Sequence, residues 1–365
     1  MEETANLPLP DAFLEFLRAN GIDPSIYAAA DSIPRYVRLE AGCEAELEEI
    51  EAEIKCQLQR VEWLPGFYSL PPHIQIASSN AYKQGKIYGI DAASGAAVMA
   101  LDISAGDHVL DLCAAPGAKL CMMLELIADE GSVTGVDVAR HRLAACRTMV
   151  QKYKLGDRCR LFVADGTSFS LIPLRSSSQF RSCDSDLEGK EERFREWTSR
   201  RPWKERKRAA RALEHAASQL ATKFDSPELI FYGPNSGIVG LKKSELYQTL
   251  SSSEFSSCGY DKVLVDAECT HDGSIKHVQK FEHWGWETLN KRVLNAERTD
   301  DLTLLQNEDV VQKFLEDNES AELKEIDPAK DWPCRSGRIS KTLRFDPVTS
   351  QTSGLFVAKF TKLAT

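Results

Sequence analysis

Apolar runs and amphipathic segments alternate along the middle of the chain. Each of the first two apolar runs is followed by a segment with helical spacing, over 119–128 and 140–153. Strand–helix alternation of this kind predicts a parallel, doubly wound α/β sheet. The buried strands are expected at 109–112, 133–137, 160–165 and 262–266.

The first 70 residues have a different pattern, which predicts a small α+β unit. Residues 11–20 and 44–58 carry apolar residues at helical spacing, and residues 34–38 favour a strand. We therefore divide the chain into an N-terminal unit, 1–70, and a main domain, 71–365. Within the main domain, residues 92–101 are rich in small residues and are expected to form a helix.

A long charged insertion at 170–257 separates the third and fourth predicted strands. Its basic stretch from Arg193 to Arg211 overlaps a segment with good helix propensity, 203–221. Two interpretations remain open. The insertion is a solvated excursion, or it is an arm that contacts RNA phosphates with Trp197 and Trp203 as stacking partners.

Composition and charge exclude several classes of protein. A hydrophobic content of 42% and a charged content of 27% are typical of a soluble globular protein, and a net charge of −10 argues against simple electrostatic adhesion to nucleic acid or membrane. The ten cysteines form no Cys-x-x-Cys pair, so we expect no metal site. No apolar run could span a bilayer, no leader is evident, and no heptad repeat indicates assembly. We expect an intracellular monomer, nuclear or cytoplasmic.

The turn after the first strand has the composition of a ligand-binding loop. It follows Asp111 and leads into the helix at 119–128. Small residues let the backbone approach a ligand closely, and a helix N-terminus offers unpaired N–H groups. The candidate cofactor-binding residues of this turn are Cys113, Ala114, Ala115, Pro116, Gly117, Ala118 and Lys119.

Carboxylates stand at the ends of the next strands as well. Asp137 can accept hydrogen bonds from ribose hydroxyls, Asp165 can accept one from an adenine amino group, and Asp266 closes the fourth strand. In an open α/β sheet, ligands bind in the crevice at these strand ends. A dinucleotide oxidoreductase is the rival interpretation, but no Gly-x-Gly-x-x-Gly follows the first strand.

The segment 111–119, Asp-Leu-Cys-Ala-Ala-Pro-Gly-Ala-Lys, resembles a signature of the RsmB/Nop/Sun family of RNA cytosine-5 methyltransferases. Ala118 replaces the second glycine of that signature. Further resemblance lies in Tyr88–Ser94, in Gln306–Val311 and in a final hairpin formed by Thr342–Pro347 and Ser353–Phe360. The likeness covers about residues 75–365 apart from the insertion.

This resemblance implies a Rossmann-like core dependent on S-adenosylmethionine (SAM), with SAM bound by Cys113–Lys119, Asp137, Asp165 and Asp266. It also implies an RNA substrate, ribosomal or transfer. Members of the family use one cysteine, in a Thr-Cys motif, to attack carbon 6 of the cytosine, and a second to help release the product. Cys269, in Asp266-Ala-Glu-Cys, corresponds to the second. Its alternative is a buried loop thiol.

The chain departs from the family at the first cysteine, because no Thr-Cys dipeptide occurs in it. The helix expected from Trp284 to Leu305 meets Gln306 directly, so a central strand has no counterpart in the sequence. Either a segment has been omitted, or the final hairpin moves inward and the sheet closes with one strand fewer.

Three functional hypotheses follow. The first is an RNA cytosine-5 methyltransferase, in which Cys269 could replace the missing nucleophile. The second is a catalytically silent variant that binds SAM or RNA. A protein methyltransferase on the same core is the third, and the cysteine at 269 counts against it.

Overall fold

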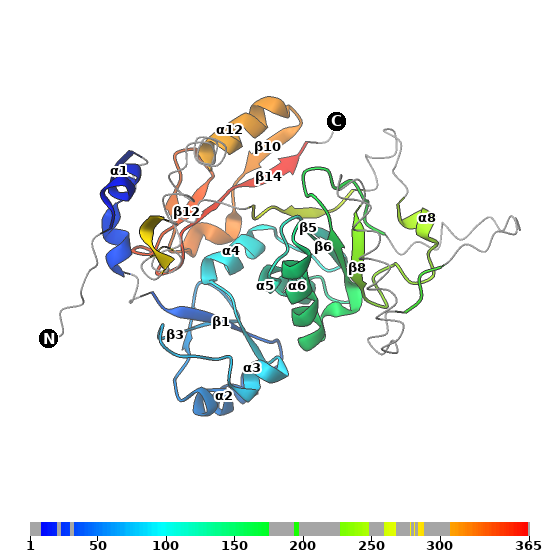
Figure 1. The fold of residues 1–365 in the computed structure, drawn as a ribbon, viewed down its shortest axis with the longest axis horizontal. Helices are drawn as coiled ribbons and strands as arrows, with labels where there is room; N and C mark the ends of the chain where they lie inside the picture. The colour runs from blue at the N-terminus through cyan, green and yellow to red at the C-terminus, as the bar shows by residue number, and fades with distance from the viewer. Residues whose placement is uncertain are drawn as a thin grey trace, which may run out of the picture. The chain divides into compact units, whose positions relative to one another are not determined.

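The computed structural model describes residues 9–19, 23–29, 33–174, 193–196, 227–247, 259–267, 278, 281, 284–287 and 307–363 (Figure 1). The chain divides into two compact units. One contains residues Met1–Asp102 together with Glu268–Thr365, and the other contains Ile103–Ala267. Within the described residues, no helix combines the length and the apolar character that a membrane span requires.

The second unit, Ile103–Ala267, is built on a five-stranded sheet with the strand order β8-β7-β6-β5-β9. All neighbouring pairs are parallel except β7 and β8, which are antiparallel. The predicted parallel sheet is therefore confirmed for four strands. The strands are β5 (His108–Asp111), β6 (Ser132–Asp137), β7 (Cys159–Val163), β8 (Glu228–Tyr232) and β9 (Lys262–Leu264).

Helices α5 (Ala118–Leu126) and α6 (Arg140–Lys152) pack side by side against this sheet (Figure 1). Strands β5, β6 and β7 are buried along their whole length, as expected of strands covered on both faces. Both helices begin within one residue of the predicted positions.

The insertion differs from the prediction because it contributes a strand to the sheet. The sequence interpretation treated 170–257 as an interruption, whereas β8 pairs with β7 inside that range. The segment Glu-Leu-Ile-Phe-Tyr has the length and apolar character of a strand. It was not predicted because it lies within a long segment rich in charged residues. A short helix, α8 (Lys243–Leu246), follows. The helix predicted at 203–221 lies outside the described residues.

The amino ends of the parallel strands are joined by a buried polar cluster. Arg160, 1% exposed, donates a 2.8 Å hydrogen bond from Nη2 to the Ser132 hydroxyl. The same hydroxyl lies 2.7 Å from Nδ1 of His108. This cluster links β5, β6 and β7 at the end opposite to the predicted cofactor crevice, and burial lowers the pKa of Arg160.

The N-terminal part of the other unit is an antiparallel sheet with the order β2-β3-β1-β4. Its fourth strand lies beyond residue 70, where the sequence places the unit's boundary. Helices α2 (Leu47–Ile54) and α3 (Asn80–Gln84) accompany it, and Ile50 and Ile54 of α2 pack into its core. The strands are β1 (Arg35–Leu39), β2 (Gln59–Arg60), β3 (Phe67–Leu70) and β4 (Ile87–Gly89).

Two further elements of this unit match predicted helices. Helix α1 (Asp11–Ala19) buries Phe13 and Leu17 against Phe281. Helix α4 (Ala92–Ala100) begins at a cap in which the Asp91 carboxylate accepts the N–H of Ala93 at 2.9 Å.

The C-terminal segment forms two small antiparallel sheets. Strands β12 (Leu343–Phe345) and β13 (Leu355–Val357) pair as the sequence predicts for the final hairpin. Strand β11 (Arg335–Ser336) joins β12, while β10 (Ala321–Lys324) pairs with β14 (Lys359–Lys362).

Helix α12 (Glu308–Asp317) is tied to this segment by a buried ion pair. Glu308 is 2% exposed and accepts a 3.0 Å hydrogen bond from Nε of Arg344 and a second one from Nη2. The N–H of Arg338 also donates to its carboxylate, at 3.1 Å. The Glu of the Gln-Asn-Glu segment therefore has a structural role, since it joins α12 to β12.

The strand that the family would place between β9 and the final hairpin would fall within 288–306, which the structure does not describe. Among the described strands, β9 pairs with β5 alone and β14 pairs with β10 alone. Among the described strands, β9 thus has a partner on the β5 side alone.

Candidate active site

The carboxyl ends of four parallel strands bring the predicted cofactor residues together. The turn after β5 lies against β6, because the N–H of Ala114 donates to the carbonyl of Val136 at 2.9 Å. The N–H of Leu112 donates to the carbonyl of Leu264 in β9 at 3.0 Å. The loop that carries Cys113 to Lys119 is thus fixed from both sides by neighbouring strands.

Gly117 is the residue at which this loop joins α5. Its φ of 111° lies in the region that favours glycine, and it caps the first turn of α5. A Cβ added here would lie 2.9 Å from the Cα of Cys146 in α6. The loop, α5 and α6 therefore meet in a contact that has room for glycine only.

Asp137 organises the loop from the end of β6. One carboxylate oxygen accepts the N–H of Ala115 at 3.2 Å, and the other accepts the N–H of Ala139 at 2.9 Å. A carboxylate has roughly four acceptor sites, so capacity remains for the hydroxyls of a nucleoside. The side chain is buried, and its two hydrogen bonds hold the loop against the end of β6.

Lys119 and Asp266 join the helix α5 to the end of β9. The ammonium of Lys119 lies 2.7 Å from the carboxylate of Asp266. The pair is partly exposed, as a group that meets a ligand must be.

Asp165 lies beyond the end of β7 and makes only local contacts. Its carboxylate accepts hydrogen bonds from the N–H and the hydroxyl of Thr167, at 2.9 and 2.7 Å. These bonds lower its pKa. This is the geometry of a turn residue, and it leaves the exposed carboxylate accessible to a ligand.

Asp111 belongs to the strand-end carboxylates that the sequence indicates, but the sequence interpretation gave it no binding role. Its side chain is 1% exposed and accepts the N–H of Cys113 at 3.2 Å. Burial raises the pKa of Asp111 to about 7, although the Cys113 N–H and the charge of Lys119 act in the opposite direction. The available signal was its position at the end of a strand, which it shares with the three selected aspartates.

The described cysteines around the crevice are poor nucleophiles. Burial raises the pKa of Cys113 to about 11 and that of Cys146 to about 12, with nearby aspartates adding to the effect. Burial also raises the pKa of Cys159, which lies at the opposite end of β7. A thiolate is the reactive form, so these residues are suited to packing. Cys269, the candidate catalytic residue, lies outside the described residues.

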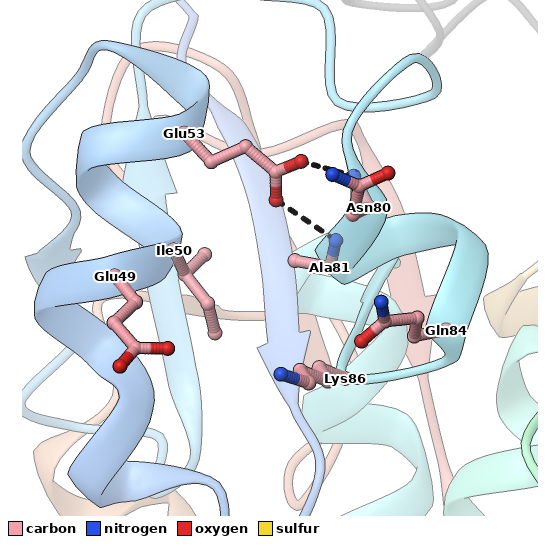
Figure 2. Close-up of a pocket in the computed structure, with 7 residues that line it drawn as sticks. All are labelled: Glu49, Ile50, Glu53, Asn80, Ala81, Gln84 and Lys86. Carbon is pink, nitrogen blue, oxygen red and sulfur yellow. Dashed lines mark hydrogen bonds between the residues drawn. The ribbon is translucent and has the colours of Figure 1, made fainter.

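A separate pocket of about 240 Å³ lies between α2 and α3 in the N-terminal sheet unit, and Figure 2 shows its lining. The Glu53 carboxylate accepts the N–H groups of Asn80 and Ala81 and thereby caps α3. Lys86 is paired with Glu46. The Glu53 contacts join α2 to α3, and none of the predicted cofactor residues lines the pocket. Among the described residues, no cluster of three or more potential metal ligands occurs.

Comparison with known proteins agrees with this geometry. The sequence family described as 16S rRNA methyltransferase RsmB/F matches residues 98–180, which include the whole loop and the ends of β5, β6 and β7. This match agrees with the resemblance to the RsmB/Nop/Sun family that the sequence shows. The matched segment contains the loop and three of the strand ends where the sequence predicts a cofactor.

Two relatives show how much of the chain is shared. A 28S rRNA (cytosine-C(5))-methyltransferase of Mus musculus is 27% identical over 221 residues, 60% of this chain and 47% of the mouse protein. A ribosomal RNA small subunit methyltransferase B of Enterobacter is 39% identical over 85 residues, 23% of this chain and 19% of that protein. The chain spans less than half of the length of either relative.

Solved structures agree on the fold over nearly the whole chain. NSun6 from Pyrococcus horikoshii, solved with SFG, has a TM-score of 0.54 at 14% identity and covers 98% of this chain and 99% of its own. A methyltransferase homologue from the same organism has a TM-score of 0.51 at 19% identity and covers 97% and 100%. The Rossmann-like methyltransferase fold predicted from the sequence is confirmed.

Proposed function

We propose that this chain binds SAM in the crevice at the ends of β5, β6, β7 and β9. The observation that carries the proposal is the Asp137 carboxylate. It accepts hydrogen bonds from the backbone N–H groups of Ala115 and Ala139, and it can still accept others from a ligand. The loop also fits the cofactor. Gly117 leaves its backbone free of side-chain atoms, and the nine-residue helix α5 directs its N-terminus toward the loop.

Each candidate residue has a separate role in this proposal. Asp137 accepts the ribose hydroxyls, and Asp165 accepts the adenine amino group. The loop from Cys113 to Ala118 lies along the cofactor with its backbone. Lys119 holds Asp266 at the end of β9 through their 2.7 Å contact, next to the position of the target base.

The proposed reaction is methylation of carbon 5 of a cytosine in RNA, either ribosomal or transfer. Its support is the match of residues 98–180 to the RsmB/F family, together with similar proteins named for rRNA methylation. SAM, when bound, supplies an electrophilic methyl group. A thiolate that adds to carbon 6 of the base makes carbon 5 nucleophilic. After the methyl group is transferred, the proton on carbon 5 leaves to a base and the thiolate departs.

Cys269 is the candidate that this chain offers for a thiol step. The cysteines described around the crevice have raised pKa values, so they are unsuited to attack. Cys269 follows Asp266 by three positions in the sequence. Its role is to help release the product or, in the absence of a Thr-Cys motif, to act as the nucleophile. The RNA would be met in the nucleus or the cytoplasm.

The second candidate function is a catalytically silent protein that binds SAM and RNA. The observation that favours it is the sequence itself, which holds no Thr-Cys dipeptide. Both candidates predict an intact cofactor crevice, and they differ only in methyl transfer.

The SAM proposal is tested by equilibrium binding to the wild type and to Asp137→Ala. Loss of a charged hydrogen bond costs about 1.5–3 kcal/mol, so we expect affinity to fall roughly tenfold to a hundredfold. Asp129→Ala, an exposed aspartate in the same unit, is the matched control and should bind as the wild type does. Equal affinity for all three proteins would refute the assignment of the crevice.

Methyl transfer is tested with labelled SAM and RNA. We expect incorporation that is lost in Cys269→Ala and retained in Cys334→Ala, and trapping of the wild type by RNA with 5-fluorocytosine. Binding of SAM without incorporation or trapping would establish the silent variant. Incorporation that survives Cys269→Ala would eliminate Cys269 as the nucleophile.

A further inference from the structure

Three carboxylates meet at the cofactor loop from three neighbouring strands. Asp111 ends β5, and the parallel register sets it opposite residues of β6 and β9 that lie two positions before Asp137 and Asp266. The three side chains therefore share the carboxyl edge of the sheet. Among the described residues, the cation paired with this group is Lys119, whose ammonium lies 2.7 Å from the carboxylate of Asp266.

Asp111 is the most enclosed of the three carboxylates. It is 1% exposed, whereas Asp137 is 5% exposed and the side chain of Asp266 is 40% exposed. One oxygen of Asp111 accepts the N–H of Cys113 at 3.2 Å, and in the described part of the chain no ion pair includes this carboxylate. A buried carboxylate without an ion pair is costly to ionise, so its protonated form is favoured.

The charges around Asp111 act in both directions. The ammonium of Lys119 in α5 favours the ionised form, while the carboxylates of Asp137 in β6 and Asp266 in β9 oppose it. Burial is the largest effect, and it raises the pKa of Asp111 to about 7. At neutral pH about half of the molecules therefore carry a proton there. Three further groups whose charge would act on Asp111 are thiols that burial keeps neutral: Cys113, Cys146 and Cys159.

Binding of SAM would change this balance by one positive charge. SAM carries a sulfonium, whereas its demethylated product, S-adenosylhomocysteine (SAH), has a neutral sulfur and otherwise the same charged groups. An opposite charge within about 4–6 Å lowers the pKa of a carboxyl group by about 1–3. The proposed position of SAM lies along the loop whose Cys113 N–H is bound by Asp111. A sulfonium there favours the carboxylate form of Asp111, and the neutral sulfur of SAH does not.

We propose that Asp111 makes the crevice select SAM over SAH by releasing its proton when SAM binds, an inference that rests on the proposed SAM site. Protonated Asp111 and SAM give a complex that holds an Asp111 carboxylate and one proton in solution. When SAH replaces SAM, Asp111 takes a proton back from solvent. Asp111 acts through its charge and is a specificity-determining residue, with no part in the transfer of the methyl group.

The affinity for SAM should therefore depend on pH with a definite sign. Below a pKa of about 7, free Asp111 holds a proton that must leave on binding, so affinity falls as pH is lowered. Above about 7, Asp111 is already ionised and the affinity levels off. If the sulfonium lowers the pKa by about 1–2, the affinity should rise roughly five- to tenfold between about pH 6 and about pH 8.

Asp111→Asn keeps the size of the side chain and removes its titration. We expect this variant to bind SAM roughly tenfold to a hundredfold more weakly than the wild type at about pH 8, which is the fold-change that the same pKa shift implies. Its affinity for SAH should equal that of the wild type. A purely structural role of Asp111 would instead weaken the binding of both ligands equally.

Calorimetric titration of the full chain with SAM, in buffers of different ionisation enthalpy, counts the protons released. At about pH 7 we expect the wild type to release about half a proton more per SAM than Asp111→Asn does. The α-amino group of the ligand titrates near about 8 and contributes equally to both proteins. With SAH the two proteins should not differ. Asp129→Asn, at an exposed aspartate of the same unit, is the control and should release protons as the wild type does.

Infrared difference spectra of the wild type keep the test decisive if Asp111→Asn does not fold, as judged by circular dichroism. The carbonyl band of a protonated carboxylic acid should be lost when SAM is added and kept when SAH is added. A band that SAM leaves unchanged, proton release that persists in Asp111→Asn, or equal loss of affinity for SAM and SAH would refute the role of Asp111 alone. A wild type that does not bind SAM would refute the proposed site and this role with it.

Discussion

Replacing Gly117 with alanine tests whether the cofactor loop depends on a close approach of two helices. The backbone at this position has a φ of 111°, outside the regions that L-residues prefer. Holding alanine there costs about 1–3 kcal/mol. The added Cβ would also lie 2.9 Å from the Cα of Cys146 and 3.3 Å from its Cβ.

The contact with Cys146 decides the size of the effect. Overpacking of this kind costs about 1–3 kcal/mol. Alanine also lowers the conformational entropy of the unfolded chain, but this stabilises the fold by only about 0.4–1 kcal/mol. We therefore expect Gly117→Ala to lower the free energy of unfolding by about 2–5 kcal/mol, a large part of a typical total of about 5–15. Because relief requires the loop or α6 to move, the affinity for SAM should fall as well.

Urea unfolding and equilibrium SAM binding measure the two effects. Gly106→Ala is the matched control, since its φ is 89° but the nearest atom to an added Cβ is 3.8 Å away. Gly106→Ala should lose only the free energy that a positive φ costs alanine, and it should bind SAM as the wild type does. Truncating Cys146 to alanine in the Gly117→Ala background should give no rescue, because the closest atom is backbone. If Gly117→Ala is no less stable than Gly106→Ala and binds SAM fully, the reasoning is refuted.

Three further predictions concern the core and its ionisable groups. Glu308→Gln should lower the free energy of unfolding by about 3 kcal/mol, the low end of the range for a broken buried pair, because Arg344 is 41% exposed. Burial alone would raise the pKa of Glu308, but hydrogen bonds from Arg344 and Arg338 outweigh it and lower the pKa. The stabilisation is therefore present above an unfolded pKa of about 4.3 and should disappear in urea titrations as pH falls through the lower folded value. For Asp111 the sign is opposite, since its folded pKa of about 7 is above the usual one. Stability of the wild type should fall as pH rises from about 4 to about 7, and Asp111→Asn should remove that part of the slope, measured by urea unfolding across the same range. Gly95→Ala in α4 would place a Cβ 2.3 Å from Cζ of Phe67. We expect a net loss, because overpacking of about 1–3 kcal/mol exceeds the helix-propensity gain of about 1, and a thermal melt at or above that of the wild type would contradict this packing.

The parts of the fold that could be predicted from the sequence have strong local signals. Strands β5, β6 and β7 are uninterrupted apolar runs, and α5 and α6 follow them with helical spacing. The loop at 111–119 has a distinctive composition, so its place between β5 and α5 could be predicted. These features depend on residues close together in the chain.

Features that depend on distant partners were missed or remain untested. Strand β8 becomes a strand because β7 offers an edge, and the charged residues around it gave no indication of that pairing. Arg160 would be assigned to the surface from its chemistry, yet Ser132 accepts its hydrogen bond in the interior. Asp111 resembles any residue at the end of a strand until its burial is known. The roles of Cys113–Lys119, Asp137, Asp165, Asp266 and Cys269 stay predictions.

The return of the chain to β7 through β8 has a practical consequence for engineering. The polypeptide leaves the sheet after β7 and returns beside the same strand in β8, so the β7–β8 pairing fixes both ends of the intervening segment. The entropic cost of closing such a loop grows slowly, by about 0.6 kcal/mol for each doubling of its length. Added length between β7 and β8, away from the loop at 111–119, is therefore expected to cost the fold little, which suits the insertion of a fluorescent reporter.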